Sequence, residues 1–93
     1  KQAHPENYIR FAESYYFLGI LKAEVGDYKA AKNLLDKSLK IYEKSYGKEH
    51  VQYGRVLGYL GKTYLLEGKL DQADNLLQKS LEILDKNEHG DAY

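Results

Sequence analysis

The sequence predicts an all-α fold made of antiparallel helical hairpins stacked side by side. Three observations support this prediction. A single proline, Pro5, leaves nearly all of the 93-residue chain without a strong helix breaker. Apolar residues recur at steps of three and four, which is typical of amphipathic helices and not of strands. Residues 26–45 also recur as residues 68–87, with identity at ten of twenty aligned positions.

Two helices are predicted in the first half of the chain. The first covers residues 5–25, with an apolar face made of Tyr8, Phe11, Tyr15, Leu18 and Leu21 or Lys22. Gly26 follows it, where glycine can adopt the left-handed conformation that ends many helices. Asp27 is the expected N-cap of the second helix, residues 28–46. The apolar face of that helix is Ala31, Leu34, Leu35, Leu39 and Tyr42.

The second half predicts another pair of helices. The third helix covers residues 49–67, with Tyr53, Val56, Leu57, Leu60, Tyr64 and Leu65 as its apolar positions. Gly54, Gly58 and Gly61 lie inside it and indicate that another segment packs closely there, because glycine otherwise costs a helix about 1 kcal/mol. The fourth helix covers residues 70–87, with Ala73, Leu76, Leu77, Leu81 and Leu84. Connections of two or three residues make successive helices antiparallel.

The two halves share a motif. The first unit reads Tyr15-x-x-Leu18-Gly19 and then Ala31-x-x-x-Leu35. The second reads Leu57-x-x-Leu60-Gly61-x-x-Tyr64 and then Ala73-x-x-x-Leu77. These residues resemble the tetratricopeptide repeat, and the resemblance implies a right-handed solenoid of stacked hairpins. Small residues at Gly19, Gly61, Ala31 and Ala73, and at Ser38 and Ser80, would let the helices approach closely.

The chain departs from that family pattern at three points. Lys22 stands where Tyr64 matches the motif, and Glu43 and Asp85 replace the usual proline. The repeat spacing is 42 residues, against 34 in the common form. Long units of this kind resemble the repeats of kinesin light chains.

We expect a single domain over residues 1–93. Unit one covers about 5–46 and unit two about 48–87, and residues 88–93 resemble the start of a third unit. This pattern predicts a fragment of a longer array. Its uncovered end units could support self-association.

Composition narrows the classes of partner. The chain has 14 basic and 14 acidic residues and no cysteine. A neutral chain has no net field toward nucleic acid or an anionic membrane. No apolar run approaches the roughly 18 residues of a membrane span, and no signal peptide is recognisable, so we expect a cytoplasmic protein.

No catalytic or metal-binding pattern is recognisable, and we expect neither an enzyme nor a cofactor. His4, His50 and His89 each lie in a comparable loop at the entry to a repeat unit. Metal ligation is one interpretation of these histidines, and the simpler one is a residue that caps or packs the next helix. The serines have no adjacent histidine that would activate them.

The family resemblance implies a non-enzymatic interaction module. In the family, the first helices of successive units line a concave groove that holds a peptide or helix of a partner protein. Mapped onto this sequence, the groove residues are Glu13, Tyr16, Phe17, Ile20, Glu24, Arg55, Tyr59, Lys62 and Leu66. Gly58 would leave space for a partner side chain. The lysine and asparagine pattern with which chaperone-binding members hold a peptide carboxylate is missing from these stretches.

Alternatives remain open for the function and for the charges. The array could be a regulatory or sensor domain of a larger signalling protein or enzyme, or a structural spacer. Residues 28–46 carry net charge +3 and residues 70–87 carry −2. These charges are explained most simply as solvated faces with pairs such as Lys32–Asp36, and alternatively as opposite charges that steer stacking of end units.

Overall fold

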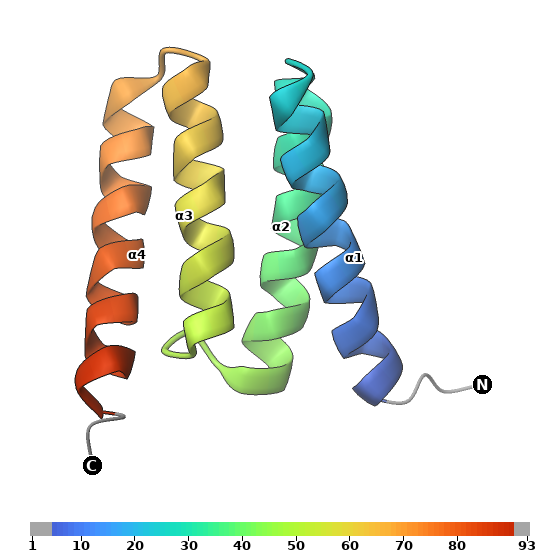
Figure 1. The fold of residues 1–93 in the computed structure, drawn as a ribbon, viewed down its shortest axis with the longest axis vertical. Helices are drawn as coiled ribbons and strands as arrows, with labels where there is room; N and C mark the ends of the chain where they lie inside the picture. The colour runs from blue at the N-terminus through green and yellow to red at the C-terminus, as the bar shows by residue number, and fades with distance from the viewer. Residues whose placement is uncertain (1–4, 91–93) are drawn as a thin grey trace.

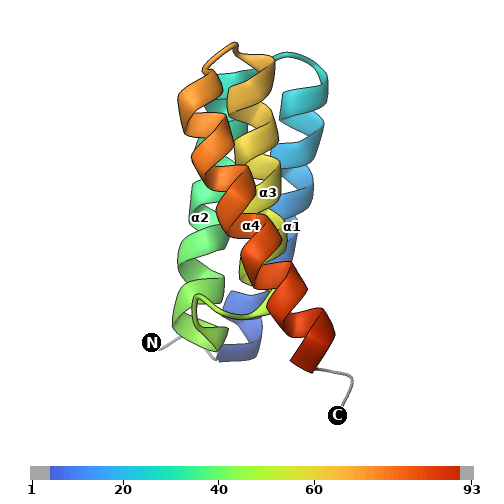
Figure 2. The ribbon, with the colours of Figure 1, turned by 90° about the vertical axis from the view of Figure 1, so that its left-hand side faces the viewer.

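The structure is a computed structural model that describes residues 5–90, which form four α-helices and no strand (Figure 1). The helices are α1 (Pro5–Glu24), α2 (Tyr28–Tyr46), α3 (Val51–Leu66) and α4 (Leu70–Gly90). α1 packs on α2 and α3 packs on α4, while α2 and α3 join the two hairpins. Figure 2 shows the α3–α4 hairpin in front of the α1–α2 hairpin. The predicted all-α stack of antiparallel hairpins is confirmed.

Glycine ends three of the helices as predicted. Gly26, Gly47 and Gly68 have φ values of +88°, +97° and +85°, a region that other residues rarely adopt. The chain folds back in the same way after α1 and after α3. The Asp27 N–H donates to the Lys22 carbonyl at 2.8 Å, and the Lys69 N–H donates to the Tyr64 carbonyl at 2.9 Å. Both units therefore turn through the same hydrogen bond.

The helix starts depend on side-chain caps. Asp27 accepts a hydrogen bond from the Ala30 N–H at 3.3 Å, so the predicted cap of α2 is confirmed. α3 begins two residues later than predicted, because His50 is its N-cap and its Nδ1 accepts from the Gln52 N–H at 3.0 Å. The connection from α2 to α3 is correspondingly longer than expected.

The helix ends differ slightly from the prediction. α1 and α3 each end one residue earlier than expected. α4 continues to Gly90, because no glycine follows Asn87 in the way that Gly47 follows Tyr46. His89 therefore lies in a helix and not in a loop. Residues 91–93, the remainder of the predicted third unit, lie outside the described residues, as does His4.

Three glycines of α3 allow α4 to approach closely. A Cβ atom built on each would lie within 3 Å of an α4 side chain: Ile83 for Gly54, Ser80 for Gly58 and Leu77 for Gly61. The prediction that another segment packs against these glycines is confirmed. Gly19 has the same role in the first hairpin, where an added Cβ would lie 2.8 Å from Leu35 Cγ.

A buried serine ties together the helices of each hairpin. Ser38 Oγ donates to the Ala12 carbonyl at 2.8 Å, and Ser80 Oγ donates to the Gly54 carbonyl at 2.7 Å. The two serines are equivalent in the repeat, and so are the two carbonyl groups. A small polar residue is therefore needed here for a hydrogen bond between helices as well as for space.

The hydrophobic core lies between the two hairpins. Its buried members are Ala12, Leu35, Leu39, Tyr42, Val56, Leu57, Leu60 and Ile83. Leu35 from α2 and Val56 from α3 are among the largest fully buried side chains. The core thus joins the two repeat units into one body.

Most of the predicted apolar face of α1 is wrong: Tyr15 is half-buried, but the alternative Lys22 is exposed. Phe11, Leu18 and Leu21 are exposed, and the residues that α1 buries are Ala12, Gly19 and Ala23. The α1–α2 contact is close and takes the small residues of α1, and within the described residues no helix covers the face of α1 that carries Leu18 and Leu21. The side chain of Tyr8 lies outside the described part of the chain.

Two predicted apolar positions and one predicted ion pair in the other helices are also wrong. Leu65 and Leu81 are exposed. Within the described residues, α4 packs only on α3, so Leu81 has no helix above it. Lys32 does not pair with Asp36. Its Nζ lies 2.7 Å from Glu67 Oε1, which links α2 to the end of α3, whereas Asp36 pairs with Lys40 at 3.1 Å.

Candidate functional site

The nine predicted groove residues occupy matching positions on α1 and α3. Eight of them form four pairs of residues that are 42 positions apart: Glu13 and Arg55, Phe17 and Tyr59, Ile20 and Lys62, Glu24 and Leu66. The ninth residue is Tyr16 of α1. α1 and α3 also contact each other directly. The residues therefore come from two helices that meet.

Tyr16 connects the two helices at the centre of this set. Its ring centroid lies 5.7 Å from that of Tyr59, with the rings edge to face, and 5.5 Å from that of Phe17. Tyr16 and Tyr59 are half-buried, while Phe17 is exposed. Partial burial and the nearby Tyr59 raise the pKa of Tyr16 above its usual value, with Arg55 acting in the opposite direction. Tyr16 therefore keeps its proton at neutral pH and can donate a hydrogen bond.

One pocket lies between these helices near the first turn of α2. Its volume is about 260 Å³, and five of the nine predicted residues line it: Ile20, Glu24, Tyr59, Lys62 and Leu66. Tyr28, Ala23 and Thr63 also line it and were not predicted. Tyr28 is the first residue of α2, next to the turn that returns the chain toward α1. That neighbouring turn was the one sequence signal that could have identified Tyr28.

Arg55 belongs to a second pocket, between α3 and α4. It has a volume of about 500 Å³ and is lined by Arg55, Gly58, Tyr59, Lys62, Leu65, Leu77, Ser80 and Leu84. Tyr59 and Lys62 line both pockets. Glu13, Tyr16 and Phe17 line neither of them. The structure thus places predicted residues in two pockets, which share Tyr59 and Lys62. The aromatic contact of Tyr16 with Phe17 lies beside these pockets.

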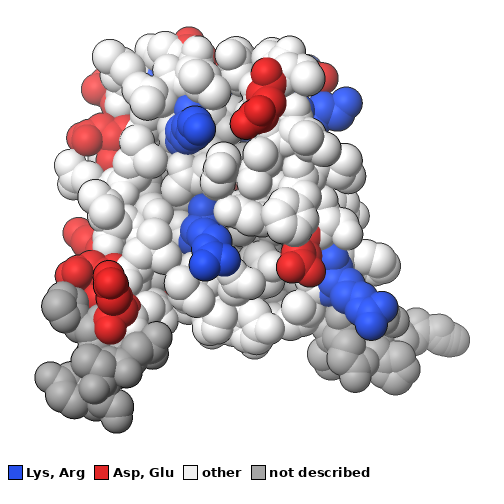
Figure 3. Space-filling model, in the orientation of Figure 1, with Lys and Arg blue, Asp and Glu red and all other residues white. Residues whose placement is uncertain are grey.

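The charges around these pockets differ between the two helices. α1 contributes Glu13 and Glu24, and α3 contributes Arg55 and Lys62. Lys62 Nζ lies 5.5 Å from the ring centroid of Tyr59. Arg55 Nη1 donates to Gln52 Oε1 at 3.3 Å. Figure 3 shows that this side of the molecule is largely uncharged, with separate basic and acidic side chains on it.

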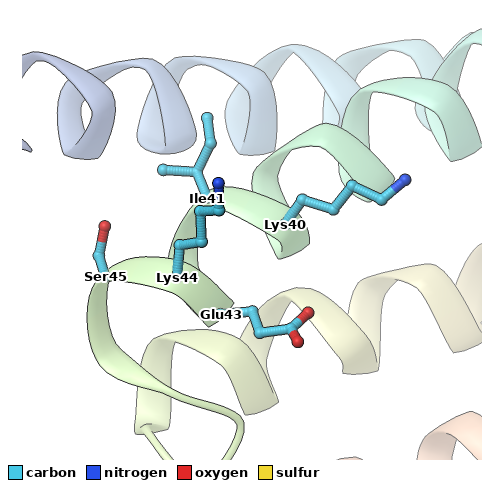
Figure 4. Close-up of a pocket in the computed structure, with 5 residues that line it drawn as sticks. All are labelled: Lys40, Ile41, Glu43, Lys44 and Ser45. Atoms are coloured by element: carbon cyan, nitrogen blue, oxygen red, sulfur yellow. The ribbon is translucent and has the colours of Figure 1, made fainter. Parts of the chain in front are cut away.

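Another pocket lies on α2, away from the predicted residues. Its volume is about 380 Å³, and it is lined by Lys40, Ile41, Glu43, Lys44 and Ser45 (Figure 4). Ile41 points toward α1 and the Lys44 side chain extends beside it, whereas Lys40 and Glu43 point in other directions. Ser45 has no histidine beside it among these residues, so the pocket offers no pair of nucleophile and base.

The predicted capping role is confirmed for His50. Besides accepting the Gln52 N–H, its ring stacks on Tyr46 with centroids 4.1 Å apart. The side chain of His89, like all of His4, lies outside what the structure describes. Among the described residues no group of three histidine, cysteine or acidic side chains could hold a metal ion. None of the described helices has the length and apolar content needed to span a bilayer.

Comparison with known proteins agrees with the repeat pattern. A family model described as Tetratricopeptide repeat matches residues 10–86, which include both motifs and parts of all four helices. No curated protein and no solved structure matches the chain. The narrower resemblance to kinesin light chains therefore stays a prediction.

Proposed function

Because the chain belongs to the tetratricopeptide repeat family, we propose that it is a non-enzymatic interaction module that binds a partner peptide or helix on the concave side of α1 and α3. Repeats of this family generally mediate protein–protein interactions, and the family is typically non-enzymatic. The partner lies across both helices, over the pocket of Ile20, Tyr59 and Leu66.

One observation carries this proposal. Exposed or half-buried apolar side chains gather where α1 meets α3, and single charges surround them. Leu66 and Phe17 are about half exposed and take no part in the core. An apolar centre with a polar edge is the usual composition of a surface that recognises a peptide.

The charges indicate the chemistry of the partner. The acidic residues Glu13 and Glu24 lie on α1, and the basic residues Arg55 and Lys62 lie on α3. A segment with a basic side chain facing α1 and an acidic one facing α3 would complement both. An apolar side chain between them would fill the pocket, and the neutral Tyr16 would donate a hydrogen bond to a partner carbonyl.

A selection of peptides from a random display library tests this proposal and requires no identified partner. We expect the selected peptides to combine an apolar residue with one basic and one acidic residue. Addition of such a peptide to the isotopically labelled chain should shift the backbone amide resonances of residues 13–24 and 55–66. Shifts confined to the outer surfaces of α2 and α4 would contradict the groove assignment.

A further inference from the structure

The outward face of α1 exposes large apolar side chains, whereas the residues at the same repeat positions of α3 are covered. Leu18 is 46% exposed and its counterpart Leu60 is 9% exposed, while Leu21 is 60% exposed and its counterpart Thr63 is 1% exposed. Phe11 is likewise exposed, and its counterpart Tyr53 is half-buried. α2 covers this face of α3, and within the described residues no helix covers it on α1.

The outward face of α4 shows the complementary difference from α2. Leu81 is 67% exposed, whereas Leu39, at the same repeat position of α2, is 7% exposed because α3 packs over it. Leu35 and Tyr42 of α2 are buried, and their counterparts Leu77 and Leu84 are only half-buried. α4 therefore repeats the surface on which α2 receives α3.

We propose that copies of this chain associate head to tail, with α1 of one copy packed on α4 of the next. In this contact α1 takes the place on α4 that α3 takes on α2. The internal α2–α3 contact supplies the template, and within the described residues no helix covers either of the two faces it would join. This inference does not depend on the proposed peptide-binding function.

The charges at one point of the template support a second copy as the occupant. In the internal contact, Lys32 Nζ lies 4.6 Å from the ring centroid of Tyr64. The counterpart of Lys32 in α4 is Asp74, and the counterpart of Tyr64 in α1 is Lys22. Head-to-tail packing thus brings the Asp74 carboxylate to the Lys22 ammonium group of the next copy, which are opposite charges.

Shape is complementary at a second point. Internally, Tyr16 of α1 contacts Tyr59 of α3. Their counterparts across the proposed contact are Gly58 and Phe17 of the next copy. Gly58 lies in the 500 Å³ pocket between α3 and α4, so the exposed Phe17 ring meets a position without a side chain. Glycine thus replaces one of the two large residues of the internal pair, which leaves room for the Phe17 ring of the next copy.

The location of these charges corrects one expectation from the sequence. Steering by the positive α2 and the negative α4 would require both helices to lie at ends of the stack. α2 lies between α1 and α3, so the complementary pair is provided by α1 and α4. Because the two joined surfaces differ, the association is heterologous and can continue to further copies.

Sedimentation velocity over a wide concentration range tests the proposal. We expect the mass-average size of the 93-residue chain to rise with concentration. Leu21→Glu places a charge in the α1 face and Leu81→Glu places one in the α4 face, and each should weaken association at least about tenfold. Both residues are exposed in the single copy, so circular dichroism should show unchanged helix content.

Mixing the two variants provides the decisive measurement. One variant keeps its α4 face and the other keeps its α1 face, so the mixture should form a one-to-one dimer and nothing larger. Three outcomes would overturn the proposal: a wild-type chain that stays monomeric at every concentration, a mixture that stays monomeric while the wild type associates, or a Leu81→Glu variant that associates as the wild type does.

A charge exchange tests the Lys22–Asp74 contact separately. Lys22→Asp and Asp74→Lys should each weaken association severalfold, because each brings like charges together in contacts between its own copies. A mixture of the two should restore association, because both contacts between unlike variants pair an acidic with a basic residue. Lys79→Asp, on another part of α4, is the matched control for loss of a lysine. Equal weakening by Lys79→Asp and Lys22→Asp, without recovery on mixing, would refute the assigned register.

Discussion

Alanine at Gly19 is expected to destabilise the chain more than alanine at Gly61, although the two glycines are equivalent in the repeat. An added Cβ would lie 2.8 Å from Leu35 Cγ in the first case and 2.9 Å from Leu77 Cγ in the second. Leu35 is fully buried among α1, α2 and α3, whereas Leu77 is half-buried at the uncovered side of α4. Leu77 can move outward, which leaves the Leu76 Cβ at 3.1 Å as the remaining close contact of the new Cβ at position 61. Leu35 cannot move without displacing the core.

The expected size follows from two opposing effects. Replacement of glycine by alanine inside a helix gains about 1 kcal/mol of helix propensity. Overpacking of a closed core costs about 1–3 kcal/mol, and the full burial of Leu35 places Gly19→Ala in the upper part of that range, at about 2–3 kcal/mol. The net effect should therefore be a free energy of unfolding lower by about 1–2 kcal/mol. Each kcal/mol corresponds to about 4–8 °C in Tm for a domain of this size. Because Leu77 can move away from the new Cβ, Gly61→Ala should change the free energy of unfolding by less than about 1 kcal/mol in either direction.

Urea unfolding followed by circular dichroism at 222 nm, an amide wavelength, measures both variants against the wild type. A second change, Leu35→Ala, removes the Cγ and Cδ2 atoms that the new Cβ would approach, so the double variant should be destabilised by less than the sum of the single effects. If Gly19→Ala proves as stable as the wild type, or is harmed less than Gly61→Ala, the closeness of the α1–α2 contact is refuted.

Three further predictions concern single contacts. Ser38→Ala should cost about 1 kcal/mol in urea unfolding, because the hydrogen bond to the Ala12 carbonyl is lost; no loss would show that Ser38 serves only as a small residue. Gly68→Ala should cost about 1–2 kcal/mol through its φ of +85° alone, since no atom lies within 4 Å of the new Cβ, and an unchanged midpoint would contradict that conformation. The Lys32 hydrogen bond lowers the pKa of Glu67 below its ordinary value of 4.5, so the stability it supplies is present above pH 4.5 and is lost as pH falls through the folded-state pKa. Glu67→Gln should therefore lose less stability than the wild type in urea titrations between neutral and acidic pH, and parallel losses would refute the contribution of the ion pair.

Local patterns in the sequence were sufficient for most of the fold. α2 was predicted over its observed residues because Asp27 and Gly47 mark both ends of a clear apolar period. The repeat then predicted the second hairpin from the first. The glycines of α3 indicated a close neighbour because glycine is otherwise unfavourable inside a helix.

Contacts between distant segments could not be predicted in the same way. The large residues Phe11, Leu18 and Leu21 were assigned to a buried face, whereas α1 buries alanine and glycine. Which face is covered depends on the neighbouring helix and not on the period of the helix itself. The ion pair of Lys32 with Glu67 joins residues 35 apart, and no local pattern indicates it.

Part of the candidate groove could be predicted from equivalent positions in the two repeat units. Repeat positions placed Ile20, Glu24, Tyr59, Lys62 and Leu66 together, and they line one pocket. The division into two pockets depends on how α4 packs on α3. That packing is set by side chains of α4, which belong to the repeated segment and gave no functional signal.

The groove proposal is tested most directly by a matched pair of charge reversals, measured by calorimetry with a peptide selected on the wild-type chain. Lys62→Glu reverses a charge beside the α1–α3 pocket, and Lys79→Glu makes the same change on α4, outside that pocket. Lys62→Glu should weaken binding about five- to thirtyfold, which corresponds to about 1–2 kcal/mol, and Lys79→Glu should leave it unchanged. Equal affinities of the two variants would contradict binding on the α1–α3 face.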